Sequence, residues 1–394
     1  MINDLINDKS IEIYLQPIVS IKDKKIFAYE ALTRAYDRYG ESVSPLYLFE
    51  QAKKENLSSR LDEYVREQAL IKFADYYHKD KDVLLFLKFE SSVVEKDEKD
   101  DFVSKVYRYN ISPTNIVVEI KEDKIRDNRA LKKFIDNYRG HDFLIAIDDF
   151  GSAYSSFERL EFINPDIVKI DRSLIYNVNN NFINSELLTA ISNMCHNVGA
   201  MVVCEGVESR EEILACMQKD IDVFQGFWFS RPQENIDESI VRDILHAIDN
   251  IGNRYKISVE EIIHTKQALL GKYRAVIEDV TQIFQNENQE TSEKISDLIA
   301  KTEKLEAIYI LNYATGVQTG DTYIDRQDRF LYNPAKSGHD HSLREYYFVT
   351  KESLRGDYLS HKYLSKASGN MCRTYSSKIE LDGISYIVCC DILD

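Results

Sequence analysis

The feature that most constrains this chain is an alternation that runs from residue 10 to residue 232. Short apolar runs rich in β-branched residues alternate with longer stretches, such as 61–78, 122–139 and 185–199, in which apolar residues recur every three or four positions. Strands buried on both faces have nearly continuous apolar sequences, and the longer spacing is that of surface helices. Seven such repeats predict an α/β fold in which a parallel sheet closes into a TIM-like (β/α) barrel with its helices outside. The runs are 26–32 (IFAYEAL), 83–89 (VLLFLKF), 116–120 (IVVEI), 143–147 (FLIAI), 167–170 (IVKI), 201–204 (MVVC) and 222–227 (DVFQGF), and an additional early strand is expected at 11–16 (IEIYLQ).

The strand signal stops after Arg231-Pro232, and helical patterns follow at 236–251, 259–284 and 291–305. From residue 307 onward the pattern changes to strands and turns. The last two runs are joined by Asp382-Gly383, a pair that strongly favours a tight hairpin turn. The sequence therefore predicts a barrel domain at 1–250, a helical linker at 251–306 and a small antiparallel α+β domain at 307–394.

The helix expected at 259–284 carries an apolar stripe with a spacing close to a heptad repeat. Such a stripe is consistent with packing inside the chain, and also with an intermolecular coiled coil that would make the protein a homodimer. Lys266 interrupts it. The stripe consists of Val259, Ile262, Leu269, Tyr273, Val276, Val280 and Ile283.

Charge and composition exclude several classes of protein. The formal net charge of −16 removes the usual electrostatic attraction to a DNA duplex or an anionic membrane. The first 20 residues lack a signal-peptide pattern, and no apolar run approaches the length of a membrane span, so we expect a cytoplasmic protein. The six cysteines include no C-x-x-C pair, which favours reduced, buried thiols over a disulfide framework or a zinc site.

Polar residues follow the predicted strands at their carboxyl ends, which face one shared mouth in a barrel of this kind. Any one acidic residue at a strand end is often a helix cap or a solvated loop residue, but several on successive strands indicate a site. Converging carboxylates typically hold divalent cations, and two adjacent aspartates suit the two-metal arrangement that promotes phosphodiester displacement. The residues at these ends are Glu30, Lys88, Glu119, Asp148, Asp149, Lys169, Glu205 and Gln225.

The same residues resemble the EAL domain in their order and spacing. The resemblance covers about residues 10–235, and that family comprises cyclic di-GMP phosphodiesterases and non-catalytic relatives. It rests on Glu30-Ala31-Leu32 with Arg34, Glu119 with Glu122, the run from Asp148 to Phe157 (DDFGSAYSSF), Lys169-Ile170-Asp171, Glu205-Gly206-Val207-Glu208 and Gln225-Gly226.

The resemblance implies metal-dependent hydrolysis of cyclic di-GMP to linear pGpG with Mg²⁺ or Mn²⁺, and it assigns a role to each matching residue. Lys169 and Glu205 would be catalytic, and Lys169 would lie beside the attacking water. Arg34 would meet a ligand phosphate, Gln225 would help to bind substrate, metal and water, and Glu122 would steady the loop after Asp149. Glu30, Glu119, Asp148, Asp149 and Glu205 would ligate metal.

Two residues depart from the family pattern. Lys88 stands where the family has a metal-ligating asparagine, and Lys121 stands where it has a threonine. An ammonium group has no lone pair to donate, so we expect Lys88 to weaken one metal or to replace it as counter-ion. Alternatively, Lys88 points outward and pairs with Glu90 or Glu95.

These departures leave the function open between three possibilities. One is a cyclic-guanylate-specific phosphodiesterase that Lys88 slows. The second is a catalytically inactive effector that binds cyclic di-GMP and signals to a partner. The third is a scaffold without nucleotide affinity, for which Arg34 would be only a surface partner of Asp37.

Residues 307–394 resemble the PAS-like, Cache-like domain that follows some EAL barrels. The resemblance rests on the order of elements and on the segment Arg344-Glu345-Tyr346-Tyr347-Phe348. It implies a regulatory sensor domain in which Arg344 and Tyr346 line a pocket for a small organic anion. The alternative is that Arg344 lies on the surface and the tyrosines form part of the core.

Overall fold

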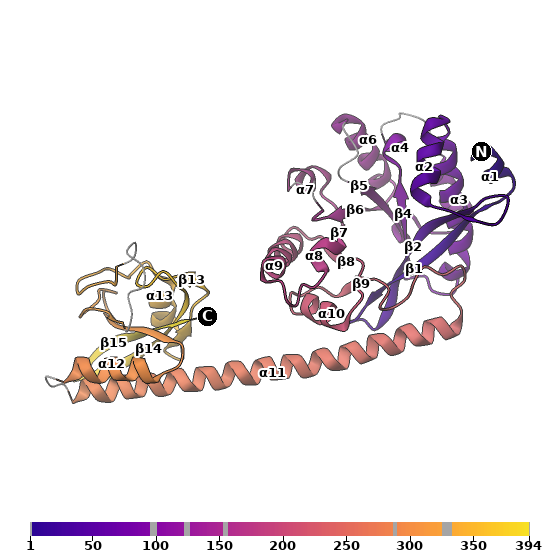
Figure 1. Cartoon of the computed structure of the whole chain (residues 1–394). Coiled ribbons are helices and arrows are strands. Elements are labelled where there is room, and N and C mark those ends of the chain that lie inside the picture. Colours follow the sequence, from indigo (N-terminus) through magenta and orange to yellow (C-terminus); the bar gives the residue numbers. More distant parts are fainter. Residues whose placement is uncertain are drawn as a thin grey trace. The chain divides into compact units, whose positions relative to one another are not determined.

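The computed structural model describes residues 2–94, 101–121, 127–152, 157–286, 290–324 and 333–393. The chain divides into two compact units, residues 1–258 and 259–394. The second unit includes residues 259–306, which the sequence assigned to a linker. Figure 1 shows the elements of both units along the chain.

The first unit contains a closed barrel of eight strands, which confirms the predicted fold (Figure 1). β1 pairs antiparallel with β2 and β9, and the remaining neighbours from β2 round to β9 pair in parallel. The early strand expected at 11–16 is thus longer than predicted and closes the barrel. The strands are β1 (Ile11–Ser20), β2 (Lys25–Tyr36), β4 (Leu84–Phe89), β5 (Ile116–Lys121), β6 (Leu144–Phe150), β7 (Ile167–Ile170), β8 (Met201–Cys204) and β9 (Val223–Gln225), with the short β3 (Ser42–Val43) on the edge of β2.

Helices surround the barrel and begin where capping residues allow. Asp127 accepts hydrogen bonds from the backbone of Arg129 and Ala130 and so starts the helix predicted at 122–139, whose first five residues lie outside the described part. Ser209 and Glu212 form a reciprocal capping box at the start of another helix. The helices are α1 (Ile2–Asn7), α2 (Pro45–Lys54), α3 (Ser58–Tyr77), α4 (Ser91–Val94), α5 (Phe102–Arg108), α6 (Asn128–Arg139), α7 (Phe157–Ile163), α8 (Arg172–Ile175), α9 (Phe182–Asn197) and α10 (Arg210–Met217), with a 3₁₀ turn η1 (Pro113–Asn115).

The barrel interior is filled by an apolar layer to which each of the eight strands contributes one side chain. Side chains alternate between the two faces of a strand, so the position two residues further along each strand also points inward. This layer therefore fixes which residues face the mouth of the barrel. Its members are Ile18, Ala28, Phe86, Val117, Ala146, Ile167, Val203 and Val223.

A single helix of 48 residues, α11 (Glu238–Gln285), follows the barrel. The prediction of two helices, at 236–251 and 259–284, was therefore wrong. Residues 252–258 contain no proline, and Gly252 alone costs a helix only about 1 kcal/mol, which the flanking turns readily offset. In the described part of the chain, no helix is long and apolar enough to cross a bilayer.

The second unit contains an antiparallel sheet in the order β11-β10-β15-β14-β12, with β13 also paired to β14. The residues of α11 from Tyr273 to Val280 pack with α12 on one face, and tyrosines of α13 pack on the other. Leu381 pairs with Ile384 across Asp382 and Gly383, whose φ angles are both positive, which confirms the predicted hairpin. The elements are α12 (Thr291–Lys301), β10 (Leu305–Asn312), β11 (Tyr323–Ile324), α13 (Glu345–Glu352), β12 (Asp357–Leu359), β13 (Tyr363–Leu364), β14 (Met371–Leu381) and β15 (Ile384–Leu393).

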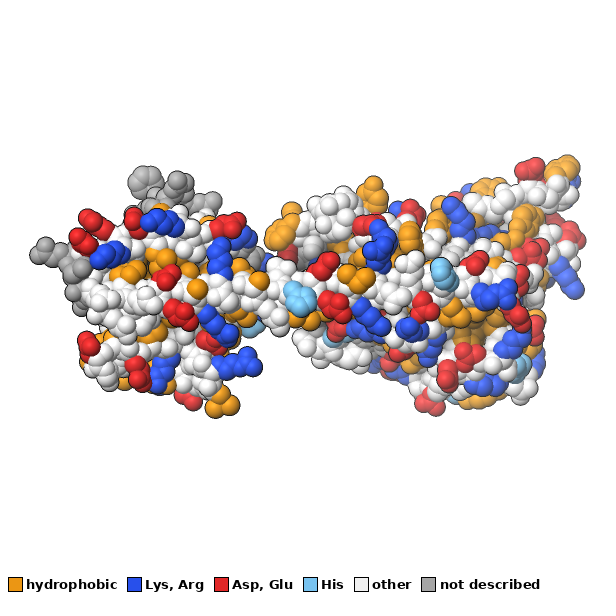
Figure 2. Space-filling view, turned by 90° about the horizontal axis from the view of Figure 1, so that it is seen from below, with side chains coloured by type: hydrophobic (Ala, Val, Ile, Leu, Met, Phe, Trp, Pro, Cys, Tyr) orange, Lys and Arg blue, Asp and Glu red, His pale blue; other side chains and the backbone are white. Residues whose placement is uncertain are grey.

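The apolar stripe on α11 has two different environments. Tyr273, Val276 and Val280 are buried in the core of the second unit, so this half packs within the chain. Ile262 and Leu269 are exposed by 49% and 38%. On the face shown in Figure 2, acidic and basic side chains are interspersed with apolar ones.

All six cysteines are buried and form no disulfide, as the sequence predicted. They are Cys195, Cys204, Cys216, Cys372, Cys389 and Cys390.

Candidate functional site

A ring of polar side chains lies two residues beyond the apolar layer of the barrel, at the mouth. Seven of its eight members are the strand-end residues singled out from the sequence, and the eighth is Gln16 on the antiparallel strand β1. Gln16 is missing from the prediction because β1 runs in the opposite direction, so the mouth lies toward its amino end. Gln16 lies two residues before Ile18, on the same face of β1. The ring consists of Gln16, Glu30, Lys88, Glu119, Asp148, Lys169, Glu205 and Gln225.

Lys169 on β7 is the central cation of this ring, and its side chain is fully buried. Its Nζ contacts Glu119 and Glu205 directly and lies 3.3 Å from Oε2 of Glu30. Asp148 Oδ1 is 3.7 Å away. A buried ammonium group is stable only when carboxylates compensate the loss of its hydration, and Lys169 has four of them within reach.

Lys88 on β4 also points into the ring. Its Nζ lies 2.9 Å from Oε1 of Glu30 and 3.2 Å from Oδ2 of Asp148, and its side chain is 40% exposed. The alternation of β4 thus places Lys88 on the same face as the other mouth residues. The alternative, in which Lys88 points outward, is wrong. Glu95 lies outside the described residues.

Asp149 takes a place beside the ring because β6 is irregular at this point. The register of β6 against β7 shifts between Ile147 and Phe150, and Asp149 has a φ of +57°, in the left-handed region that aspartate tolerates better than most residues. Two adjacent aspartates therefore both reach the mouth. Lys121 on β5 forms a 2.5 Å ion pair with Oδ2 of Asp149.

Gln225 and Gln16 connect the first and last strands of the barrel. Gln225 Nε2 donates to Oε1 of Gln16 and to Oε2 of Glu30, and Gln16 Nε2 donates to the carbonyl of Ser230. The next residue, Gly226, passes so close to the loop after β8 that a Cβ would lie 2.1 Å from the carbonyl oxygen of Val207. Only glycine allows this approach.

Arg34 lies on β2, four residues beyond Glu30. Its guanidinium group donates to the carbonyl of Thr33 at 2.8 Å and lies 5.5 Å from the centre of the Tyr14 ring. No ion pair to Asp37 is present among the described residues. Glu122, the predicted loop-steadying residue, lies outside the described part of the chain.

Burial and the buried lysines shift the pKa values of the ring's acids in opposite directions. Burial raises the pKa of Glu119 well above its usual range and that of Glu205 to about 7. Burial opposes ionisation of Glu30 and Asp148 too, but Lys169 and Lys88 outweigh it and lower both pKa values. The same carboxylates raise the pKa of each lysine well above normal although burial lowers it, so both ammonium groups stay charged.

The donor set matches what a divalent cation requires. Ligand atoms from Glu30, Glu119 and Glu205 lie within 4.8 Å of one another, and so do those from Asp148, Asp149 and Glu205. Among the described residues, Oε2 of Glu119 is buried without a hydrogen-bond donor, and the two oxygens of Asp148 have only the ion pairs with Lys88 and Lys169. Unpaired buried oxygens are costly, and a hard cation with oxygen ligands would satisfy them.

The second unit contains a separate cavity of about 540 Å³. Arg344 and Tyr346 both line it, and so do two further residues that the sequence did not single out. One is His341, which bonds through Nδ1 to the Tyr346 hydroxyl at 2.7 Å, and whose pKa is lowered to about 4 by burial. The other is the buried carboxylate of Asp391, whose Oδ1 accepts hydrogen bonds from the hydroxyls of Tyr309, Tyr363 and Thr374.

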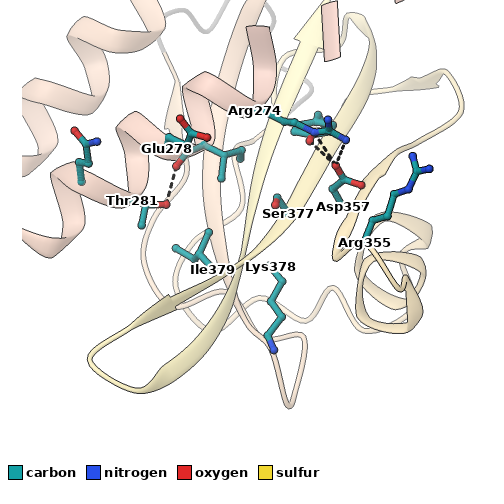
Figure 3. Close-up of a pocket in the computed structure, with 11 residues that line it drawn as sticks. Arg274, Glu278, Thr281, Arg355, Asp357, Ser377, Lys378 and Ile379 are labelled. Atoms are coloured by element: carbon teal, nitrogen blue, oxygen red, sulfur yellow. Dashed lines mark hydrogen bonds and ion pairs between the residues drawn. The ribbon is translucent and has the colours of Figure 1, made fainter. Parts of the chain in front are cut away.

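A second hollow in this unit, of about 720 Å³, lies between α11 and the sheet (Figure 3). Arg274 on α11 bonds to Oδ2 of Asp357 at 2.8 and 3.0 Å, and Tyr375 donates to the same oxygen. These bonds attach the helix to the edge of the sheet. We assign this hollow a structural role.

The barrel with its acidic mouth defines the class of protein. A model of the EAL domain family matches residues 1–232, more than half of the chain, and the chain belongs to this family.

Individual relatives sharpen the comparison. The EAL-domain containing protein YkuI of Bacillus subtilis is 25% identical over 381 residues, which cover 92% of this chain and 90% of that protein. The crystal structure of YkuI, in complex with cyclic di-GMP and calcium, has a TM-score of 0.80 and covers 100% of this chain and 99% of that chain, with 21% identity, and so shows the same fold. The probable cyclic di-GMP phosphodiesterase PdeB of Escherichia coli is 25% identical over 237 residues, which cover 59% of this chain and 45% of PdeB. The match thus spans less than half the length of PdeB.

Proposed function

We propose that this protein binds cyclic di-GMP at the barrel mouth and hydrolyses it to linear pGpG with the help of a divalent cation, Mg²⁺ or Mn²⁺. The observation that carries the proposal is the ring together with Asp149 beside it, in which five carboxylates and the buried Lys169 converge on one opening. YkuI, whose crystal structure holds cyclic di-GMP and calcium, supports the choice of ligand.

The chemistry adds one water across one phosphodiester. The water oxygen forms a bond to phosphorus, the bond from phosphorus to the 3′-oxygen breaks, and that oxygen leaves with a proton, so the product keeps a 5′-phosphate. A divalent cation at Asp148, Asp149 and Glu205 would lower the pKa of a water molecule and offset charge on the phosphoryl oxygens.

The residues of the chain have separate roles in this proposal. Lys169 holds the attacking water and, as a fixed charge, stabilises the developing negative charge. Glu205, which offers an oxygen beside Asp148 and Asp149, would hold the cation and keep the attacking water next to it. Arg34 presents a planar group of donors to a ligand phosphate, and Gln225 orients substrate beside Glu30.

The test of hydrolysis is direct. The purified 394-residue protein is incubated with cyclic di-GMP and Mn²⁺ and the linear product is followed by chromatography, with Glu205→Gln as the matched inactive control. Formation of pGpG by the natural protein alone supports the proposal. A lack of product at enzyme concentrations equal to the substrate would contradict hydrolysis.

Lys88 favours a second candidate, a catalytically inactive effector that binds cyclic di-GMP. Its ammonium group forms ion pairs with two of the carboxylates that would otherwise hold metal. Binding through Arg34 does not require those carboxylates. Calorimetry with cyclic di-GMP in Ca²⁺ buffer, using Arg34→Ala as control, separates the candidates: binding without product supports an effector, and no binding contradicts both.

We also propose that the second unit is a PAS-like sensor that regulates the barrel, and that the protein forms a homodimer. The strand order, with the last strand β15 at the centre beside the first strand β10, supports a PAS-like fold. The Arg344 guanidinium lines the cavity and has no ion pair among the described residues, which suits a small organic anion. Exposed Ile262 and Leu269 on α11 support a contact between two copies.

A further inference from the structure

We infer that this site takes one divalent cation and not two, because the ammonium group of Lys88 permanently fills the place of the other. The inference rests on the proposed metal-dependent function and concerns how the chain departs from a two-metal site. Its basis is the position of one nitrogen atom among the carboxylates.

The Lys88 Nζ lies between the carboxylates of two different strands. It is 2.9 Å from Oε1 of Glu30 on β2 and 3.2 Å from Oδ2 of Asp148 on β6. A metal that used these two oxygens would have to lie beside the positive charge of this ammonium group, which repels a second cation. Lysine cannot contribute a ligand in exchange, because a charged ammonium has no lone pair.

The deeper carboxylates are also occupied by the chain itself. Oε1 of Glu119 contacts Lys169, and the same ammonium lies 3.3 Å from Oε2 of Glu30. Glu30 and Glu119 are nearly inaccessible, with exposed fractions of 3% and 1%. In this half of the ring Lys88 and Lys169 offset the charge of the acids, and the acids are closed to solvent; Oε2 of Glu119 alone cannot hold a cation.

The outer carboxylates differ in access and in free ligand atoms. Lys121 engages only Oδ2 of Asp149, and Lys169 engages only Oε1 of Glu205, so each acid keeps an oxygen without a partner among the described residues. The Asp149 and Glu205 side chains are 37% and 16% exposed. With Asp148 they bring ligand atoms within 4.8 Å of one another, which suits a single cation entering from solvent.

The charges of the described residues agree with this count. Even with all five carboxylates of the mouth ionised, the three ammonium groups of Lys88, Lys121 and Lys169 leave no more than two negative charges. One divalent cation neutralises them. A second would make the cluster positive in a buried setting, which is unfavourable without a further anion.

The test counts metal ions, independently of activity. The purified 394-residue protein is titrated with Mn²⁺ by equilibrium dialysis, and the bound ion is examined by electron paramagnetic resonance. We expect one Mn²⁺ per chain with the spectrum of an isolated ion. Two ions per chain, a spin-coupled pair or no bound ion would each overturn the inference.

A matched pair of substitutions tests whether the position of the Lys88 ammonium group, and not merely its positive charge, limits the number of bound metal ions. Lys88→Asn and Lys121→Asn remove the same charge, but only Lys88→Asn vacates the space between Glu30 and Asp148 and supplies an amide oxygen. We expect Lys88→Asn to bind two Mn²⁺ ions with a spin-coupled spectrum and Lys121→Asn to bind one. One ion in a folded Lys88→Asn protein, or two in Lys121→Asn, would contradict the inference.

Two further variants locate the single ion even if Lys88→Asn fails to fold. Asp149→Asn should weaken Mn²⁺ binding at least tenfold, whereas Glu30→Gln should change it much less. The reverse order would place the ion in the inner half and overturn the inference. Calorimetry with cyclic di-GMP is run in parallel, so that a protein that binds one Mn²⁺ but no dinucleotide contradicts the proposed function alone.

Discussion

The barrel mouth and the cavity of the second unit both contain buried carboxylates, but they stabilise them in opposite ways. At the mouth, ammonium groups of Lys88 and Lys169 neutralise the acids, and several carboxylate oxygens have no hydrogen-bond donor among the described residues. In the cavity, Asp391 has three neutral hydroxyl donors at 2.8 to 3.2 Å. No lysine or arginine forms an ion pair with it within the described chain.

The difference shows in the protonation of the two sites. Lysines hold the pKa of Glu30 and Asp148 down against burial, so these two acids of the mouth stay charged, whereas burial dominates at Glu119 and Glu205. Hydroxyl donors lower the pKa of Asp391 less than burial raises it, and the result is about 6. A charged cluster with unpaired oxygens is suited to cations and phosphates, whereas a carboxyl poised near neutrality is suited to a polar ligand or a proton. The predictions below test this contrast.

The largest effect is expected from Lys169→Met, because it leaves four buried carboxylates without their central cation. Removal of one partner of a buried ion pair costs about 3–5 kcal/mol. We expect unfolding in urea at correspondingly lower concentration, loss of any turnover, and partial recovery of stability when Mn²⁺ is added.

Lys121→Met serves as the control for Lys169→Met, because its ion pair with Asp149 is partly exposed and should contribute less than about 1 kcal/mol. An equal loss of free energy of unfolding in the two variants would contradict the prediction that the buried Lys169 contributes more to stability than Lys121 does.

The next effect concerns catalysis. Lys88→Asn should raise the rate of cyclic di-GMP hydrolysis by about tenfold or more, since it supplies an oxygen ligand where an ammonium stood. Initial rates with Mn²⁺ measure this. An unchanged rate in a folded variant would show that Lys88 does not limit hydrolysis, and Lys121 would then be the next residue to replace.

A smaller effect is expected from Asp391. Its pKa in the folded protein, about 6, is above the ordinary 3.8, so the folded state binds this proton more tightly than the unfolded state does. The resulting stabilisation is complete below about pH 4 and is lost as the pH rises through about 6, with a total of about 3 kcal/mol.

Asp391→Asn keeps an acceptor for Tyr309, Tyr363 and Thr374 but cannot titrate. Urea unfolding at about pH 4 and about pH 7 should therefore show a smaller difference for Asp391→Asn than for the natural protein. An identical pH dependence would mean that Asp391 does not titrate as its burial indicates.

The smallest effect on stability should come from Ile262→Lys with Leu269→Lys on the exposed part of α11. Substitution of exposed residues usually changes stability by less than about 0.5 kcal/mol. We expect light scattering to show a monomer where the natural protein is a dimer. A buried counterpart, Val276→Lys, should instead destabilise the second unit, and an unchanged mass in the double variant would contradict a dimer contact on this helix.

Much of the barrel could be predicted because its signal is local. Seven apolar runs identified the strands, and the alternation of side chains placed Glu30, Glu119 and Asp148 on the inner face. Gln16 was missed because it lies on the antiparallel strand, whose carboxyl end is at the opposite edge. In α11 the local pattern failed for a different reason, since an interruption in apolar periodicity is not an interruption in helix geometry.

By itself, the sequence determined which polar residues follow the parallel strands at their carboxyl ends, because these residues interrupt nearly continuous apolar runs and side chains alternate along a strand. It also determined the departure at Lys88. Only the tertiary structure decided which lysine pairs with which acid, because strands far apart in the sequence place Lys88 between Glu30 and Asp148. Closure of β1 against β9 likewise brings Gln16 to Gln225, 209 residues away. The partners of Asp391 likewise come from β10, β13 and β14, so no local pattern could identify them. Electrostatic energy depends on distances in space, and those distances are set by the packing of the whole domain.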